Sequence, residues 1–153
     1  MLDAKALLAE AEPLMRRALA IDEASFGSEH PNVAIRLNNL AQLLKATNRL
    51  AEAEPLMRRA LAIDEASFGA EHPNVARDLN NLARLLEDTN RVAEAEPLMR
   101  WALAIVFEFE RRTGFEHPNG CVVSGNYRGL LQAMGKSEAE IESEIAAVRA
   151  ASE

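Results

Sequence analysis

Apolar residues in the middle of the chain recur at steps of three and four, the period of an amphipathic α-helix. Between residues 50 and 63 they are Leu50, Ala53, Leu56, Met57, Ala60, Leu61 and Ile63. This pattern predicts a helix over residues 50–68, which Gly69 ends as a C-terminal cap. The same period returns at Val75, Leu79, Leu82, Ala83, Leu85 and Leu86. Because proline is tolerated at the first helical position, Pro73 marks the start of this second helix, over residues 73–89.

These two helices belong to a segment that the chain contains twice. Residues 9–50 read AEAEPLMRRALAIDEASFGSEHPNVAIRLNNLAQLLKATNRL, and residues 51–92 read AEAEPLMRRALAIDEASFGAEHPNVARDLNNLARLLEDTNRV. The copies agree at 35 positions and differ at 7, and a third, degraded copy starts at Ala93. Repetition at a fixed period of 42 residues is typical of an array in which neighbouring repeats share a core.

The repeat predicts an all-α fold of antiparallel helix pairs, in a single domain over residues 1–153. We call the helix that contains LNNLA the LNNLA helix, and the one that contains AEAEP the AEAEP helix. The expected helices are 3–26, 31–47, 50–68, 73–89, 92–112, 118–134 and 137–150. Pro13, Pro55 and Pro97 lie inside the AEAEP helices, where a proline typically costs about 3 kcal/mol. Because Ala53 keeps the apolar period upstream of Pro55, we expect a continuous helix with a kink.

Small and bulky residues also follow each other at fixed steps. Across the junction of the two copies these anchors are Leu40, Ala41, Leu44, Ala53, Met57 and Ala60. Small residues let helices approach closely, and the bulky ones fill the spaces between them. The scheme resembles the tetratricopeptide repeat, and the 42-residue length with HPN before LNNLA resembles the longer repeats of kinesin light chains. Over residues 8–135 this resemblance implies a right-handed superhelical solenoid of about three and a half repeats, with LNNLA helices lining a concave groove.

The differences between the two copies point to this groove. Five of the seven lie on the LNNLA helix, and the resemblance implies that Ile35/Arg77, Gln42/Arg84, Lys45/Glu87 and Ala46/Asp88 face the groove. The predicted groove contacts are Asn38, Asn39, Gln42, Lys45, Arg77, Asn80, Asn81, Arg84 and Asn126. The resemblance also implies that the asparagines hold a peptide backbone, since each amide is both donor and acceptor. Alternatively, one asparagine of each pair bonds to the neighbouring helix and holds the stack.

Charge narrows the choice of partner. Lys45, Arg77 and Arg84 would make the groove basic, but Glu87 and Asp88 lie near them, so its predicted charge is mixed. The formal net charge of −7 gives no general attraction to nucleic acid or to an anionic membrane. We therefore expect a protein or peptide partner, with no nucleic acid and no membrane.

Nothing in the sequence indicates catalysis, a metal or a cofactor. His30, His72 and His117 occur once per repeat, so they do not converge on one ion, and we interpret them as helix-start residues. No phosphate-binding loop or nucleophile motif is present. Cys121 is the only cysteine, which excludes an internal disulfide, and we expect its side chain to be buried. Without a recognisable signal peptide or apolar span, we expect a cytoplasmic location.

The two ends of the array differ from its middle. In the third AEAEP helix, polar positions have become Trp101, Val106 and Phe107. Either the final helix, 137–150, covers this face and caps the array, or the face is an exposed interface. At the other end, the first AEAEP helix has no LNNLA helix before it, which leaves one apolar side without a cover. The residues concerned are Leu2, Leu7, Leu8 and Leu14.

The sequence thus predicts a binding module without catalysis, which holds an extended or helical protein segment in its groove. The alternative is self-assembly into a homodimer, through the uncovered first helix at Leu7 or through the face of Trp101, Val106 and Phe107. A further possibility is that the array continues in a longer protein.

Overall fold

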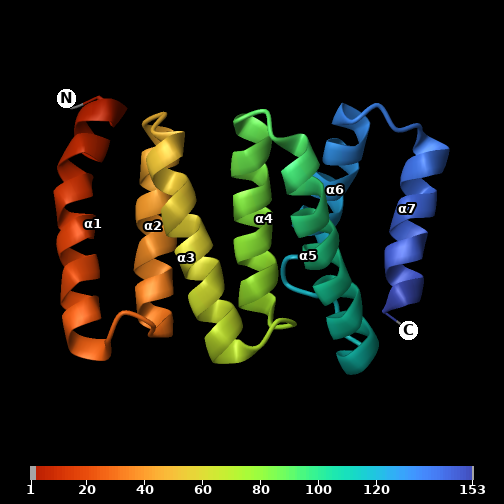
Figure 1. Ribbon diagram of the computed structural model, residues 1–153, viewed down its shortest axis with the longest axis horizontal. Helices are drawn as coiled ribbons and strands as arrows, with labels where there is room; N and C mark the ends of the chain where they lie inside the picture. Colours follow the sequence, from red (N-terminus) through yellow and green to blue (C-terminus); the bar gives the residue numbers. More distant parts are fainter. Residues whose placement is uncertain (1–2, 153) are drawn as a thin grey trace. The chain divides into compact units, whose positions relative to one another are not determined.

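The computed structural model describes residues 3–152, which form seven α-helices and no strand (Figure 1). They are α1 (Ala4–Phe26), α2 (Pro31–Ala46), α3 (Leu50–Phe68), α4 (Pro73–Asp88), α5 (Val92–Thr113), α6 (Gly120–Ala133) and α7 (Glu138–Ala151). The predicted all-α fold and its helices are confirmed, and no helix end differs by more than two residues. Leu2 lies outside the described residues.

Contacts gather the chain into two compact units, Met1–Ser67 and Phe68–Glu153. Unit 1 contains α1, α2 and nearly all of α3, and unit 2 contains α4 to α7. The LNNLA helices are α2 and α4, with α6 as their degraded counterpart, and the AEAEP helices are α1, α3 and α5. The array predicted as one domain therefore has its contacts concentrated in two clusters.

Each AEAEP helix runs without interruption through its proline, as predicted. Pro13, Pro55 and Pro97 all lie inside helices. A proline removes the hydrogen bond that its own N–H would make to the carbonyl four residues earlier, and its ring crowds that carbonyl, but the other hydrogen bonds of the helix remain possible. In α3 the apolar stripe keeps its register across Pro55, because Ala53 before it and Met57 after it are both buried.

The core of unit 1 forms where α2 meets α3. Val33, Ala34 and Leu37 of α2 form one cluster with Ala60 and Ile63 of α3. All five side chains are buried, and the two alanines let the helix backbones approach closely. By contrast, α1 has no buried residue. The interior of unit 1 is therefore provided by α2 and α3, with α1 as its partly exposed flank.

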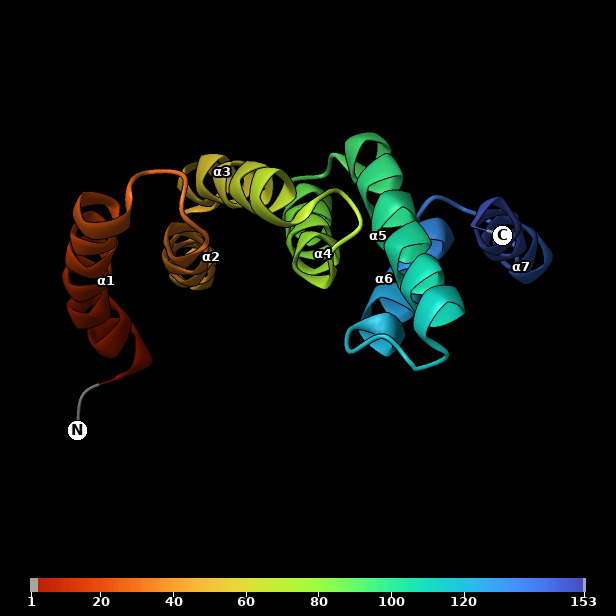
Figure 2. The same ribbon diagram turned by 90° about the horizontal axis from the view of Figure 1, so that it is seen from below.

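Unit 2 is organised around α5, which contacts α4, α6 and α7. Figure 2 shows α6 between α4 and α7, with α5 crossing beside it. The largest buried side chains of this unit are Leu79, Leu82, Leu85, Leu86, Met99, Leu103 and Tyr127. Unit 2 thus has a core that four helices enclose.

Arg49 lies in the turn before α3 and connects the two AEAEP helices of unit 1. Its Nη1 donates to Oε2 of Glu12 on α1 at 2.6 Å, and its Nε donates to Oε2 of Glu52 on α3 at 2.5 Å. The hydrogen bond from Arg49 is the main cause that lowers the pKa of each of these carboxyls. Asn48 turns the chain just before Arg49 by adopting the left-handed conformation, with a φ of 60°.

A histidine caps the start of α2 and of α4, and a third histidine makes the same hydrogen bond in the turn before α6. In His30, His72 and His117, Nδ1 accepts a hydrogen bond from the backbone N–H two residues later, at 3.0–3.1 Å. The rings of His30 and His72 also stack on Phe26 and Phe68, which end the preceding helices. The structure thus confirms His30 and His72 at helix starts, where they satisfy N–H groups that the helix itself cannot, whereas His117 lies in the turn that precedes α6.

His117 is the most enclosed of the three. Its ring is buried, packs edge-on against Phe109, and makes no hydrogen bond through Nε2 to the described residues. The backbone N–H of His117 donates to Oε1 of Glu110 at 3.2 Å. Burial lowers the pKa of His117, and the charge of Glu110 opposes this shift without reversing it.

We predict that unit 2 loses stability in mild acid because of His117. The unfolded state, with a histidine pKa of about 6.5, binds more protons than the folded state, so stability falls as the pH drops below about 6.5. His117→Asn keeps a side-chain acceptor in the turn before α6 but does not titrate. The melting temperature should therefore fall less for His117→Asn than for the parent between about pH 7.5 and about pH 5.5. Equal decreases would contradict this role of His117.

Candidate functional site

The polar face of α2 carries the first set of predicted contacts. Its exposed residues at helical spacing are Ile35, Asn39, Gln42 and Ala46. Lys45 is partly exposed, whereas Asn38 keeps only 8% of its surface accessible. Of the asparagine pair on α2, Asn39 is therefore the one that presents its amide to solvent.

The polar face of α4, in unit 2, has the same organisation. Arg84 is exposed, Arg77 and Asn81 are partly exposed, and Asn80 keeps only 7% of its surface accessible. The Nδ2 group of Asn126 on α6 donates to Oδ1 of Asn80 at 2.8 Å. This bond joins α4 to α6 and supports the helix-bridging interpretation for Asn80.

The neighbouring face of α6 carries little side-chain bulk. Val122, Gly125 and Gly129 are exposed on this helix, and a Cβ added to either glycine would meet nothing within 4 Å. In the third copy, Val122 and Gly129 stand where α4 has Arg77 and Arg84. A ligand could therefore approach the backbone of α6 more closely than that of α4.

The copies differ at two adjacent positions, Ile35/Arg77 and Arg36/Asp78, and the charged residues there form different ion pairs in each copy. In the first copy Arg36 binds Asp22 of α1, with Nε 2.7 Å from Oδ2. In the second copy the same position is Asp78, a buried residue whose Oδ1 lies 3.3 Å from Nη2 of Arg77. Part of the charge of Arg77 is thus balanced within α4, while Arg84 remains the exposed cation of this face.

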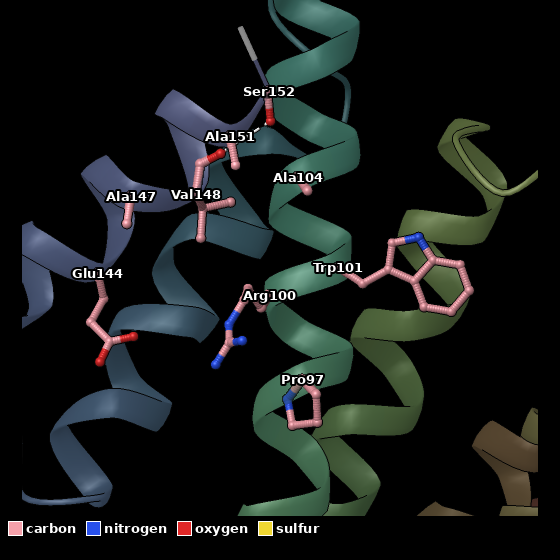
Figure 3. A pocket seen from close by; sticks show the side chains of 9 residues that line it. All are labelled: Pro97, Arg100, Trp101, Ala104, Glu144, Ala147, Val148, Ala151 and Ser152. Carbon is pink, nitrogen blue, oxygen red and sulfur yellow. Dashed lines mark hydrogen bonds between the residues drawn. The ribbon is translucent and has the colours of Figure 1, made fainter.

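The face proposed from Trp101, Val106 and Phe107 is largely covered. Val106 and Phe107 are buried, and the guanidinium of Arg149 on α7 lies 4.3 Å from the centre of the Phe107 ring. The final helix therefore covers this end of α5, which favours the capping interpretation for these two residues. Beside it, α5 and α7 line an open pocket of about 570 Å³ (Figure 3). Its lining residues are Pro97, Arg100, Trp101, Ala104, Glu144, Ala147, Val148, Ala151 and Ser152.

Trp101 is only half-buried, and it serves a structural contact. Its indole points away from α7 (Figure 3), and Nε1 donates to the carbonyl oxygen of Ala70 at 3.2 Å. In unit 1, Arg59 donates to the carbonyl oxygen of Ser28 at 3.0 Å. Because Arg59 and Ser28 lie 42 residues before Trp101 and Ala70, the indole N–H replaces the guanidinium N–H at the same helix-to-loop contact.

A buried polar network joins α5 to α6 near the pocket. The hydroxyl of Tyr127 donates to Oε1 of Glu96 at 3.1 Å, and Nη2 of Arg100 donates to both carboxylate oxygens at 2.6 and 2.7 Å. Burial raises the pKa of Tyr127 to about 12, which keeps it protonated as a donor. Sequence reasoning missed this network, although one signal was present, since Tyr127 replaces the leucine at positions 40 and 82.

Other chemistry is limited in the described structure. The prediction that Cys121 is buried is wrong: its side chain is exposed, because the position falls on the outer side of the first turn of α6. Within residues 3–152, no three His, Cys, Asp or Glu side chains come together as metal ligands would. Nor is any helix in this range long and apolar enough to span a bilayer.

A family model described as the tetratricopeptide repeat (TPR) matches residues 5–66 and 47–106, more than half of the chain. The chain belongs to the tetratricopeptide repeat family. TPR folds generally mediate protein–protein interactions as non-enzymatic scaffolds, and this is the class of function that the family assigns. A search of curated proteins found no significant match.

Solved structures confirm the likeness to kinesin light chains. A candidate kinesin light chain of Podosopora anserina, with nearly identical TPR-like repeats, is 27% identical in one crystal structure, with a TM-score of 0.71 over 94% of this chain. A second crystal structure under that description is 25% identical, with a TM-score of 0.70 over 95%. BtubC (BKLC) of P. vanneervenii is 24% identical and shares the fold, with a TM-score of 0.75 over 94%. This TPR chain spans 66%, 69% and 57% of their respective lengths.

We predict that Asn126→Ala destabilises this TPR protein by about 1 kcal/mol, because Oδ1 of the buried Asn80 loses its hydrogen-bond donor. Urea unfolding followed by circular dichroism measures this change. The matched control is Asn39→Ala, which alters an exposed asparagine and should stay within about 0.5 kcal/mol of the parent. If the Asn126→Ala variant is as stable as the control, the Asn80–Asn126 hydrogen bond does not stabilise the fold.

Proposed function

We propose that this TPR protein binds an extended or helical segment of a protein partner along the exposed faces of its LNNLA helices. In unit 2 the contacts would be Arg77, Asn81, Arg84 and Asn126. In unit 1 the corresponding contacts would be Asn39, Gln42 and Lys45 on α2. Asn38 and Asn80 would support these faces from below, because both are buried.

One observation carries this proposal. The two copies are identical over most of their length, but they differ at exposed positions of α2 and α4, such as Gln42/Arg84 and Ala46/Asp88. Buried positions such as Leu40/Leu82 and Ala41/Ala83 are the same in both copies. An exposed substitution usually changes stability little, so these positions are open to variation in a binding surface without loss of the fold.

The chemistry of the α4–α6 face suits a peptide. Asn81 and Asn126 carry amides that can donate to and accept from a backbone. The exposed guanidinium of Arg84 can pair with an acidic side chain, and Gly125 and Gly129 leave space for close approach of the ligand. Asp88 nearby keeps the face from being uniformly basic. No cofactor or catalytic group is needed for this function, and we propose the cytoplasm as its setting because a reducing medium keeps the exposed Cys121 as a thiol.

Self-assembly is the second candidate. The face of Trp101, Val106 and Phe107 offers little to a partner, since two of its three residues are buried and Trp101 contacts a loop carbonyl. The exposed side of α1 supports this function better, because Leu7, Leu14 and Ile21 are all more than half exposed there.

The test of the main proposal combines Asn81→Ala with Arg84→Glu. A peptide library displayed on phage should yield ligands for the parent protein, and the double variant should bind them at least about tenfold more weakly. Its helicity and melting temperature should stay close to those of the parent, because both side chains are accessible. The control Arg112→Glu reverses an exposed charge on α5 and should bind normally. Selected peptides that bind the double variant and the parent equally would reject the α4–α6 face as the binding site.

A further inference from the structure

An apolar stripe runs along the exposed side of α1. Leu7, Leu14 and Ile21 are 53%, 69% and 53% exposed, and each follows the one before it by seven residues. Since seven residues make almost two turns, the three side chains lie on one face of the helix. Large apolar side chains in such a row are unusual on a surface that contacts only water.

The other AEAEP helices show what this face is built to contact. Ile21 corresponds to Ile63 on α3 and to Ile105 on α5, which are only 1% and 2% exposed. Ile63 is covered by α2, where it packs against Val33 and Leu37. The same side of an AEAEP helix thus receives another helix in the complete repeat of unit 1, and the described residues of unit 1 provide no such helix for α1.

The stripe has the pattern of a helix-to-helix seam. Ala4, Ala11 and Ala18 alternate with Leu7, Leu14 and Ile21 at steps of three and four. This is a heptad pattern with a small residue at one core position and a large residue at the other. From Ala4 to Ile21 the seam is roughly 26 Å long.

The alternation of small and large residues makes the seam complementary to itself in the antiparallel direction. When two such helices cross a two-fold axis, Ala11 of one lies opposite Leu14 of the other, and Ala4 lies opposite Ile21. The same register sets Leu7 opposite Ala18. Every layer then combines a large side chain with a small one, whereas a parallel arrangement would set alanine against alanine and leave gaps.

Charges beside the seam select the same arrangement. Glu10 and Arg17 are exposed, lie seven residues apart, and each immediately precede a seam alanine. In the antiparallel register, Glu10 of each copy lies within one helical turn of Arg17 of the other. Two equivalent ion pairs, each between Glu10 and Arg17, can therefore form beside the seam. The sizes and the charges of these residues therefore both favour α1 of a second copy as the partner of the seam.

We propose that α1 is a homodimerisation helix, which pairs with α1 of a second copy of the chain in an antiparallel seam centred between Ala11 and Leu14. This interface is separate from the α4–α6 face. The variant with Asn81→Ala and Arg84→Glu should therefore dimerise normally, so the two proposals succeed or fail independently.

Light scattering coupled to size-exclusion chromatography tests the dimer across about a hundredfold range of concentration. The parent chain should show twice the mass of one copy at the upper end, and Leu14→Lys should show the mass of one copy throughout. The matched control is Phe115→Lys, which removes an exposed apolar residue of unit 2 and should leave the dimer intact. A parent chain that stays monomeric overturns the proposal.

Charge reversal tests the antiparallel register. Arg17→Glu sets like charges together on both sides of the two-fold axis and should weaken the dimer, and adding Glu10→Arg should restore it with the charges exchanged. Circular dichroism spectra like that of the parent verify that these exposed substitutions leave the fold intact. A dimer that resists Leu14→Lys, or one that the second reversal fails to restore, rejects this interface.

Discussion

The whole architecture depends on one constraint, which is that an AEAEP helix is apolar on more sides than one neighbour can cover. In unit 2, α5 meets this constraint by contacting α4, α6 and α7, and in unit 1 one side of α3 is covered where Ala60 and Ile63 pack against α2. Small residues allow this close approach, and the bulky ones remove the space between the helices. Helix pairs of this kind become stable by stacking, because a single pair leaves apolar surface in water.

The apolar sides of α5 and α1 differ in how far other helices cover them. At the end of unit 2, α7 covers Phe107, and Tyr127 enters the core to donate to the buried carboxylate of Glu96. A buried charge is tolerated when it is paired and hydrogen-bonded, so this polar network suits the last helix pair. At the other end α1 carries no such adaptation, and Leu14 and Ile21 keep the surface that a neighbouring helix would cover.

Sequence periodicity predicted the elements well, because helix length, caps and the 42-residue repeat are local signals. It was less informative about which residues of the predicted groove face are buried and which are exposed. Asn80 and Asn81 are adjacent and identical in type, yet only Asn80 lies deep enough to accept a hydrogen bond from Asn126. The first member of the pair is the buried one on α2 as well as on α4, but its hydrogen-bond partner Asn126 comes from α6, which the local pattern of α4 does not reveal. The exposure of Cys121 was misjudged for a similar reason, since a short apolar run does not reveal which turn faces outward.

The contact between Trp101 and Ala70 shows how far a repeat can change while its geometry is kept. Arg59 uses its guanidinium to reach the carbonyl of Ser28, and Trp101 reaches the equivalent carbonyl with an indole N–H. The two side chains differ in charge and shape, but both are long and end in a donor, which is all that this contact requires. At exposed positions of α2 and α4 such as Gln42/Arg84, the chemistry of the residue changes between the copies. Positions that must satisfy a backbone group keep their chemistry when their residue changes, whereas positions that face solvent are open to a new ligand.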